Sequence, residues 1–385
     1  MIKIGARNSP LARAQVDLIA AALAAEGVET EFVPIRTQGD VDQRELTQIG
    51  GTGVFTAAVR DRLLDRSIDL AVHSLKDLPT APVDGLEVVA YPTREDTHDV
   101  LVGPVVGPHG LIAEHGLGRP LVIGTGAPRR AVQLQQLAAD RGIDLVVEPI
   151  RGNVDTRLAK VREGRYDATV LAAAGLRRLN RLEGLDRLEG LNQVDGSARR
   201  DGDGSTGLTV AGLPAAVLPY HELLPAPGQG ALAVEASTEL DSKIRTVLTR
   251  LNDAVTRAEV LAERRFLAVL EAGCTAPVGA RASLSSAPAD LGTASVMGAG
   301  GRTVRDPGTD LTLVAVIGKT RGDEDSRLTR SGTESTELQD RSTDSVSSHG
   351  LLVTVSGSGD DPIALGSRLA SLALSAVDPN EFRIA

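Results

Sequence analysis

The sequence predicts an α/β protein with two similar lobes and a smaller third domain of α+β type. Strand-like and helix-like segments alternate through the first part of the chain, the alternation restarts near residue 121, and the last third mixes strand-like runs with a final helix. Such alternation is typical of mainly parallel sheets that are covered by helices. A length of 385 residues exceeds one ordinary core and fits two or three domains.

The first lobe begins with a short strand and a helix that has clear start and stop signals. Ser9 offers a side-chain cap, Pro10 takes the first helical position, and Gly27 ends the helix. The other expected elements of this lobe are strands at residues 28–36, 69–73 and 86–91 and a helix at residues 55–65.

The second unit repeats this alternation, and residues 91–100 form the candidate hinge before it. Pro128 opens one helix and Asn153 caps the next. We expect strands at residues 121–124, 144–150 and 168–171, and helices at residues 128–140 and 153–164.

The rest of the chain mixes both kinds of segment. We expect strands at residues 231–236, 278–284, 311–317 and 351–355, and helices at residues 241–251, 254–270 and 362–376. Residues 193–207 and 321–349 are polar and contain few apolar side chains, which cannot offset the entropy of ordering. We interpret both as poorly ordered surface insertions.

The overall charge excludes a general nucleic-acid binder, because the formal net charge is −10. Only five of the 41 basic residues are lysine, so arginine, the better planar partner for carboxylates, predominates. The single cysteine cannot form an internal disulfide, and we find no signal peptide and no apolar run long enough to span a membrane. These features predict a cytoplasmic protein.

Arginine recurs where strand-like runs end. The turn at residues 124–130 (GTGAPRR) enters a helix and carries Arg129 and Arg130, although an ordinary turn with two solvated arginines explains it equally well. Arg7, Arg151 and the pair at residues 177–178 follow other strands. Ligands of open α/β sheets bind at these strand ends, so the pattern indicates a ligand with several carboxylates or phosphates.

Two further segments carry candidate chemistry. In residues 71–79 (AVHSLKDLP), Asp77 could act as an acid, a base or a fixed negative charge, or could simply belong to a charged surface turn. Cys274 lies in a loop between Gly273 and Pro277, which shifts the balance modestly toward a reactive or modified thiol and leaves the usual small buried hydrophobe as the alternative. The six histidines show no metal-site spacing with the cysteine, so no metal is predicted.

These segments together resemble the porphobilinogen deaminase (hydroxymethylbilane synthase) family. The matching elements occur in the family's order at residues 6–12 (ARNSPLA), 71–79, 94–96 (RED), 124–130, 151–157 (RGNVDTR), 174–179 (AGLRRL), 227–230 (PGQG) and 273–274. The resemblance implies two lobes similar to type II periplasmic binding proteins, with mixed sheets, and a small α+β C-terminal domain. The implied domains are residues 1–93 with 231–250, residues 97–226 and residues 253–385.

The resemblance also implies a transferase of tetrapyrrole and heme biosynthesis. Cys274 would hold a dipyrromethane cofactor through a thioether. Four porphobilinogen molecules would be added with loss of ammonia, and hydrolysis would then release hydroxymethylbilane. The enzyme would be a monomer without nucleic-acid or membrane partners.

Site roles follow from the same resemblance. Asp77 would be the catalytic carboxylate that stabilises the cationic azafulvene formed when ammonia leaves. An active-site loop would include Asp40, Thr52 and Phe55. The residues that would bind cofactor and substrate are Arg7, Ser9, Gln15, Ser74, Lys76, Thr125, Arg129, Arg130, Arg151, Gly152, Asn153, Arg157, Arg178 and Gln229.

Some positions depart from the family pattern. Thr52 stands where bacterial relatives carry lysine, and Gly126 and Ala127 replace two serines, so a loop cation and two hydroxyl donors are lost. The main alternative is a non-catalytic two-lobed anion-binding protein, which does not explain the cysteine loop. A transferase acting on phosphorylated substrates is a further alternative, but the sequence shows no Walker-type lysine or acidic metal-binding pair.

Overall fold

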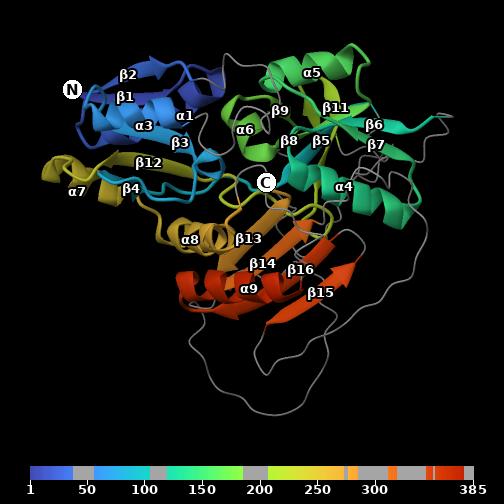
Figure 1. Cartoon of the computed structure of the whole chain (residues 1–385). Helices are drawn as coiled ribbons and strands as arrows, with labels where there is room; N and C mark the ends of the chain where they lie inside the picture. Colours follow the sequence, from blue (N-terminus) through green and yellow to red (C-terminus); the bar gives the residue numbers. More distant parts are fainter. Residues whose placement is uncertain are drawn as a thin grey trace.

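The computed structural model of the chain describes residues 1–37, 56–104, 119–184, 207–272, 276–284, 311–318, 344–349 and 352–376. These residues form three sheets. Two lie side by side in separate lobes, and the third lies below them in the view of Figure 1. No helix among the described residues is long and apolar enough to cross a membrane.

The first lobe contains a five-stranded sheet in the order β2-β1-β3-β12-β4. β1 pairs in parallel with β2 and β3, whereas β12 is antiparallel to both of its neighbours. Its strands and helices are β1 (Ile2–Arg7), α1 (Pro10–Ala25), β2 (Thr30–Ile35), α3 (Ala57–Leu64), β3 (Leu70–Ser74), β4 (Leu86–Ala90), β12 (Leu232–Ser237) and α7 (Ser242–Arg250). The predicted cap is confirmed, because the Ser9 side chain accepts a hydrogen bond from the Ala12 backbone N–H.

The second lobe contains a seven-stranded sheet in the order β7-β6-β8-β5-β11-β10-β9. Here β6 pairs in parallel with β7 and β8, and β5 is antiparallel to both β8 and β11. Its elements are β5 (Asp99–Val102), β6 (Leu121–Gly124), α4 (Pro128–Arg141), β7 (Leu145–Glu148), α5 (Val154–Arg162), β8 (Ala168–Ala172), α6 (Ala173–Arg178), β9 (Leu182–Glu183), β10 (Thr209–Val210) and β11 (Leu213–Leu218).

The two lobes share one strand order. Each sheet runs from its second strand through its first and third to an antiparallel strand, β12 in the first lobe and β5 in the second, beyond which lie β4 and β11, respectively. That antiparallel strand always arrives from the other lobe. The first crossover, residues 91–98, leads into β5, and the second crossover, residues 219–231, leads into β12. Because each lobe completes its sheet with a strand delivered by a crossover, the two lobes are topologically interlocked.

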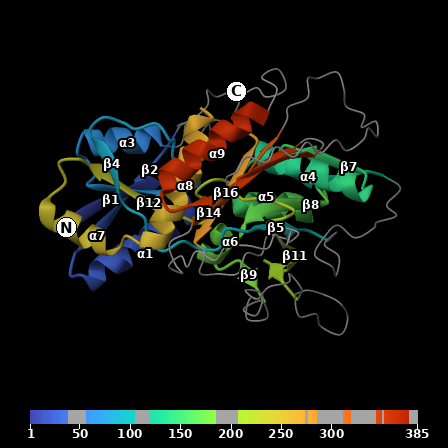
Figure 2. The same ribbon diagram turned by 90° about the horizontal axis from the view of Figure 1, so that it is seen from below.

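The third sheet is antiparallel and has the order β13-β14-β16-β15. Helices α8 and α9 lie side by side against it, and Figures 1 and 2 show this packing from two directions. Phe266 of α8 and Leu369 of α9 are fully buried in the shared core. The elements are α8 (Ala254–Val269), β13 (Val278–Leu284), β14 (Leu311–Gly318), β15 (Ser345–His349), β16 (Leu352–Gly359) and α9 (Pro362–Ala376).

The structure corrects the sequence analysis at several places. Residues 345–349 form the edge strand β15, because alternating side chains such as Val346 pack into the core while the strand pairs with β16. The prediction that all of residues 321–349 are poorly ordered was therefore wrong at this end, and residues 321–343 lie outside the described part. Residues 193–206 also lie outside it. Strands β5 and β9 to β11 and helix α6 were not predicted.

One buried carboxylate joins the crossovers to the third sheet. Glu263 of α8 is fully buried and accepts two hydrogen bonds of 2.8 Å from the Arg94 guanidinium in the first crossover. It also accepts the backbone N–H of Gly228 in the second crossover and of Ala282 in β13. Burial lowers the pKa of Arg94, but the charges and hydrogen bonds of Glu263 and Glu259 more than offset this and raise it.

We expect Glu263→Gln to destabilise the protein by about 3 kcal/mol, because it leaves the buried Arg94 guanidinium with only the Glu259 carboxylate. Urea unfolding of the purified chain measures this loss. The matched control is Asp17→Asn, which removes an exposed ion pair with Arg13 and should cost less than about 0.5 kcal/mol. Equal losses in the two variants would contradict the role of Glu263 as a buried junction.

Candidate functional site

The predicted site residues gather where strands of both lobes end. Arg7 is the last residue of β1, Ser74 ends β3, and Thr125 follows β6. Arg178 ends α6, which directly follows β8. Helix α1 of the first lobe contacts α6 of the second, so these strand ends face one another across the junction of the lobes.

Lys76 and Asp77 lie in a single 3-10 turn, η1 (Leu75–Asp77), directly after β3. The half-buried Lys76 Nζ donates a hydrogen bond of 3.2 Å to Gln229 Oε1. Burial lowers the pKa of Lys76 to about 8. The Arg130 and Arg129 charges act in the same direction, and Asp77 and Asp99 oppose it. Asp77 is exposed.

Arg129 and Arg130 are buried and share one carboxylate, that of Asp99. Arg129 Nη2 donates to Asp99 Oδ2 at 2.7 Å, and Arg130 Nη2 donates to Asp99 Oδ1 at 2.6 Å. Their other terminal nitrogens bond the backbone carbonyls of Leu224 and Val170. The alternative of two solvated arginines is therefore wrong. Arg130 Nε is buried and has no hydrogen-bond partner among the described residues.

The RGN segment supplies both charge and local structure. Arg157 Nε donates to the Gly152 carbonyl at 2.9 Å. Burial, with repulsion by Arg130 and Arg151, lowers the pKa of Arg157 to about 10, and the Asp77 charge opposes this shift. The Asn153 side chain caps α5 by accepting the Thr156 backbone N–H. Gly152 has φ +112°, and a Cβ there would lie 2.6 Å from the Thr156 side chain. Local structure thus accounts for Gly152 and Asn153.

Hydrogen bonds to neighbouring residues fix several other predicted site residues in place. Gln15 Nε2 donates to Ser74 Oγ at 2.8 Å, which fixes two of them together. Thr125 is buried, and its hydroxyl accepts the Ala127 backbone N–H at 3.2 Å. Arg178 Nη2 donates to the Gly230 carbonyl, and burial lowers the pKa of this arginine.

Several predicted residues lie outside the described part of the chain. These are Asp40, Thr52, Phe55 and Cys274. The stretch that carries Cys274 is bounded by Ala272 and Ala276, which are both buried. Beyond it, the Ala280 N–H of β13 donates to the Pro225 carbonyl, so β13 lies against the second crossover.

Asp99 is the site residue that the sequence analysis missed. It is fully buried at the start of β5, and the charges of Arg129, Arg130 and Lys76 overcome the effect of burial and hold its pKa well below the usual range. A carboxylate at the head of the apolar run DVLV was the available signal. The first two residues of the run were instead included in the expected hinge, residues 91–100.

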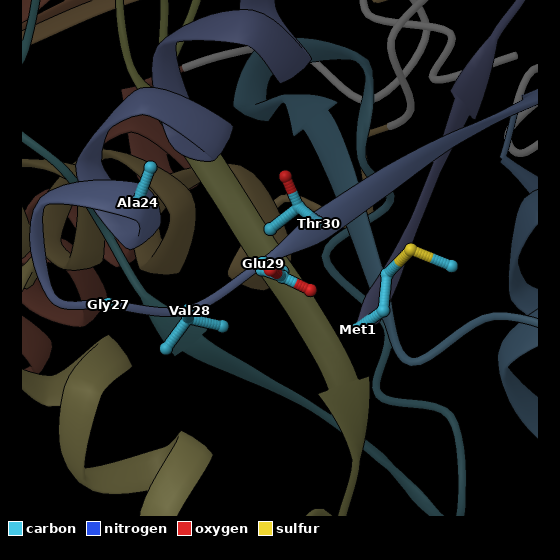
Figure 3. A pocket seen from close by; sticks show the side chains of 6 residues that line it. All are labelled: Met1, Ala24, Gly27, Val28, Glu29 and Thr30. Carbon is cyan, nitrogen blue, oxygen red and sulfur yellow. The ribbon is translucent and has the colours of Figure 1, made fainter.

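Basic groups outnumber carboxylates at this junction. Arg151 and Arg157 lie near Arg130 and Asp77, whereas Arg7 ends β1 and Arg178 ends α6. The carboxylates among these cations and Lys76 are those of Asp77, Asp99 and, near Arg178, Glu95. Partly buried cations that repel one another favour a multivalent anion, so the residues fit a ligand with many carboxylates. By contrast, a pocket of about 510 Å³ formed by Met1, Ala24, Gly27, Val28, Glu29 and Thr30 lies at the opposite ends of β1 and β2 (Figure 3) and is not part of this site.

The strand order and the cation-lined junction define a two-lobed α/β protein with the architecture of type II periplasmic binding proteins, to which a third α+β unit is added. Residues 2–246 match the family described as porphobilinogen deaminase, dipyromethane cofactor binding domain, and residues 257–339 match porphobilinogen deaminase, C-terminal domain. The chain belongs to the porphobilinogen deaminase family.

Relatives of known name agree with this assignment. The chain is 43% identical to porphobilinogen deaminase 1 of Streptomyces coelicolor over 83% of its length and 85% of the relative. It is 44% identical to porphobilinogen deaminase 1 of Streptomyces avermitilis over 74% of its length and 78% of the relative. A solved substrate-binding domain of a putative amino acid ABC transporter from Streptococcus pneumoniae gives a TM-score of 0.33 at 10% identity, covering 65% of this chain and 91% of that one.

We expect citrate, a small multivalent carboxylate, to raise the melting temperature of the purified chain by relieving repulsion among the buried cations. Arg157→Gln should weaken the apparent citrate affinity about tenfold, since it removes one charge-assisted hydrogen bond. Arg13→Gln, an exposed arginine in α1, serves as the control. Unchanged citrate affinity in Arg157→Gln would exclude Arg157 from the anion site.

Proposed function

We propose that the chain adds four porphobilinogen molecules, with loss of ammonia each time, to a dipyrromethane primer attached to Cys274, and then hydrolyses the product to release hydroxymethylbilane. The chain is a transferase of this family. The observation that carries the proposal is the excess of partly buried cations over carboxylates at the junction of the lobes.

The substrate's charge matches this excess. Each porphobilinogen unit brings an acetate and a propionate, so the bound chain gains negative charge with every addition. Arg7, Arg151, Arg157 and Arg178 would bind these carboxylates, and Arg130 offers its unpartnered Nε. Arg129 has both terminal nitrogens engaged, so we propose that it supports Asp99 rather than the ligand.

Asp77 would provide the opposite charge for the chemical step. Positive charge develops on the substrate pyrrole as ammonia leaves, and a fixed carboxylate beside it would stabilise the transition state by several kcal/mol. The exposed side chain at the end of η1 can approach a bound pyrrole. Because water weakens such an interaction, the full effect requires the ligand to cover Asp77.

The attachment site and the surroundings of the reaction form a further part of the proposal. Dipyrromethane bound through Cys274 would supply the free pyrrole position to which the next unit is added. The loop with Asp40, Thr52 and Phe55 would border the site. We also propose a monomer that works in the cytoplasm, with domains at residues 1–93 and 231–250, 97–226, and 253–385.

The intact mass of the purified protein should exceed the sequence mass by one dipyrromethane unit. Cys274→Ser should lack this adduct, because the chain contains no other cysteine. Mass spectrometry of the undigested chains measures both masses. An adduct that persists in Cys274→Ser would place the attachment elsewhere. A chain that binds porphobilinogen but neither carries an adduct nor consumes the substrate would support the alternative of a non-catalytic anion-binding protein.

Asp77→Asn should retain the covalent adduct yet lower kcat by at least about a hundredfold, since the neutral amide cannot stabilise developing positive charge. The assay follows the disappearance of porphobilinogen. Asp84→Asn changes another exposed carboxylate of the same lobe and should keep normal turnover. Near-normal kcat in Asp77→Asn would remove Asp77 from the chemistry.

A further inference from the structure

The side chain of Gln229 connects the two lobes at the centre of the site. It lies in the second crossover and is fully buried. Its Nε2 donates to the Thr97 carbonyl at 2.8 Å and to Asp99 Oδ1 at 2.9 Å, and its Oε1 accepts from Lys76 Nζ at 3.2 Å. Both amide hydrogens and the oxygen of Gln229 are therefore engaged within the protein.

These partners allow only one orientation of the Gln229 amide. A carboxylate and a carbonyl face one end, so that end must be the NH2 group, and the oxygen must face the Lys76 ammonium. The flipped amide would set an oxygen against two acceptors and an NH2 group against a cation. Asp99 therefore sets the orientation of the Gln229 amide, and this orientation places the amide oxygen against the Lys76 ammonium.

The surrounding structure fixes both members of this relay. The Asp99 carboxylate is held from the other side by Arg129 and Arg130. The Gln229 carbonyl accepts from Arg94 Nε at 2.9 Å. The next residue, Gly230, has φ +83°, and a Cβ there would lie 2.3 Å from the Glu95 carbonyl oxygen, so this backbone position requires glycine.

We propose that Asp99 and Gln229 are positioning residues, which hold the Lys76 ammonium in place for a ligand carboxylate and do not bind the ligand themselves. This inference rests on the proposed function for the identity of the ligand. It replaces the expectation that Gln229 binds cofactor or substrate, because both amide hydrogens are used within the protein and the side chain is fully buried.

The charges around Lys76 indicate in which direction a substitution of Gln229 should shift the pKa of Lys76. Asp77 on η1 and Asp99 on β5 favour the ammonium, whereas Arg129 and Arg130 on α4 disfavour it. Gln229 contributes an oxygen that accepts a hydrogen bond from the ammonium and so favours the charged form. Removal of that oxygen should lower the pKa of Lys76 from about 8, and a smaller fraction of the lysine would be charged at neutral and alkaline pH.

The test compares Gln229→Met with the unchanged full-length protein as purified. Because the chain has only five lysines, side-chain 15N NMR can follow each ammonium during a pH titration, and Lys76→Arg identifies the Lys76 signal by its loss. We expect the Lys76 midpoint to fall by about one pH unit in Gln229→Met. The alkaline limb of kcat/KM for porphobilinogen should move by the same amount.

Matched variants separate this effect from general disturbance. Gln136→Met removes another buried amide from α4 and should leave the midpoint unchanged. Asp99→Asn should lower the midpoint further, with Asp167→Asn, which alters a different arginine-paired carboxylate, as its control. If Asp99→Asn does not fold, Gln229→Met decides the question alone, because it keeps the pairs of Asp99 with Arg129 and Arg130.

The outcomes distinguish this proposal from the proposed function. An unchanged Lys76 midpoint in Gln229→Met, in a protein that consumes porphobilinogen, overturns the positioning role and leaves the function standing. A lowered midpoint in a protein whose unchanged form consumes no porphobilinogen supports the positioning role and overturns the function.

Discussion

The arrangement of the three sheets depends on the hydrogen bonds that the buried Glu263 carboxylate accepts. It binds the first crossover through Arg94, the second through the Gly228 N–H, and β13 through the Ala282 N–H. Both crossovers between the lobes thus contact one charged group on helix α8, which packs against the third sheet. Because a buried charge is stable only when it is fully paired, this junction fixes how the crossovers lie together.

The site itself has the opposite electrostatic character. At Glu263 the buried charges are balanced, whereas at the strand ends arginines and Lys76 crowd around Asp99 and Asp77 with charge left over. The resulting repulsion destabilises the protein, and a ligand rich in carboxylates relieves it. The balanced junction and the unbalanced site are close neighbours, since Gln229 follows Gly228 directly. The paired charges at Glu263 therefore support a binding surface whose cations repel one another.

Much of the fold could be predicted from the sequence, because local signals mark many elements. Helix α9 begins and ends as expected, and β13 also has the predicted bounds. Strand β11 was missed because Pro214 interrupts its pattern, and β5 because its first two residues fall within the expected hinge. The arginines were found from their places after strands. The pairing of Arg129 and Arg130 with Asp99 could not be predicted, since it depends on how α4 and β5 lie together in three dimensions.

The interlocked strand order affects how the protein folds during its synthesis on the ribosome. The first lobe needs β12 between β3 and β4, but β12 begins only at Leu232, after the whole second lobe has been synthesised. Until then β3 and β4 have unpaired edges, which are prone to wrong association. The second lobe, complete by Leu218, can form its sheet earlier. The N-terminal lobe is therefore the later of the two to finish folding, against the usual order of synthesis.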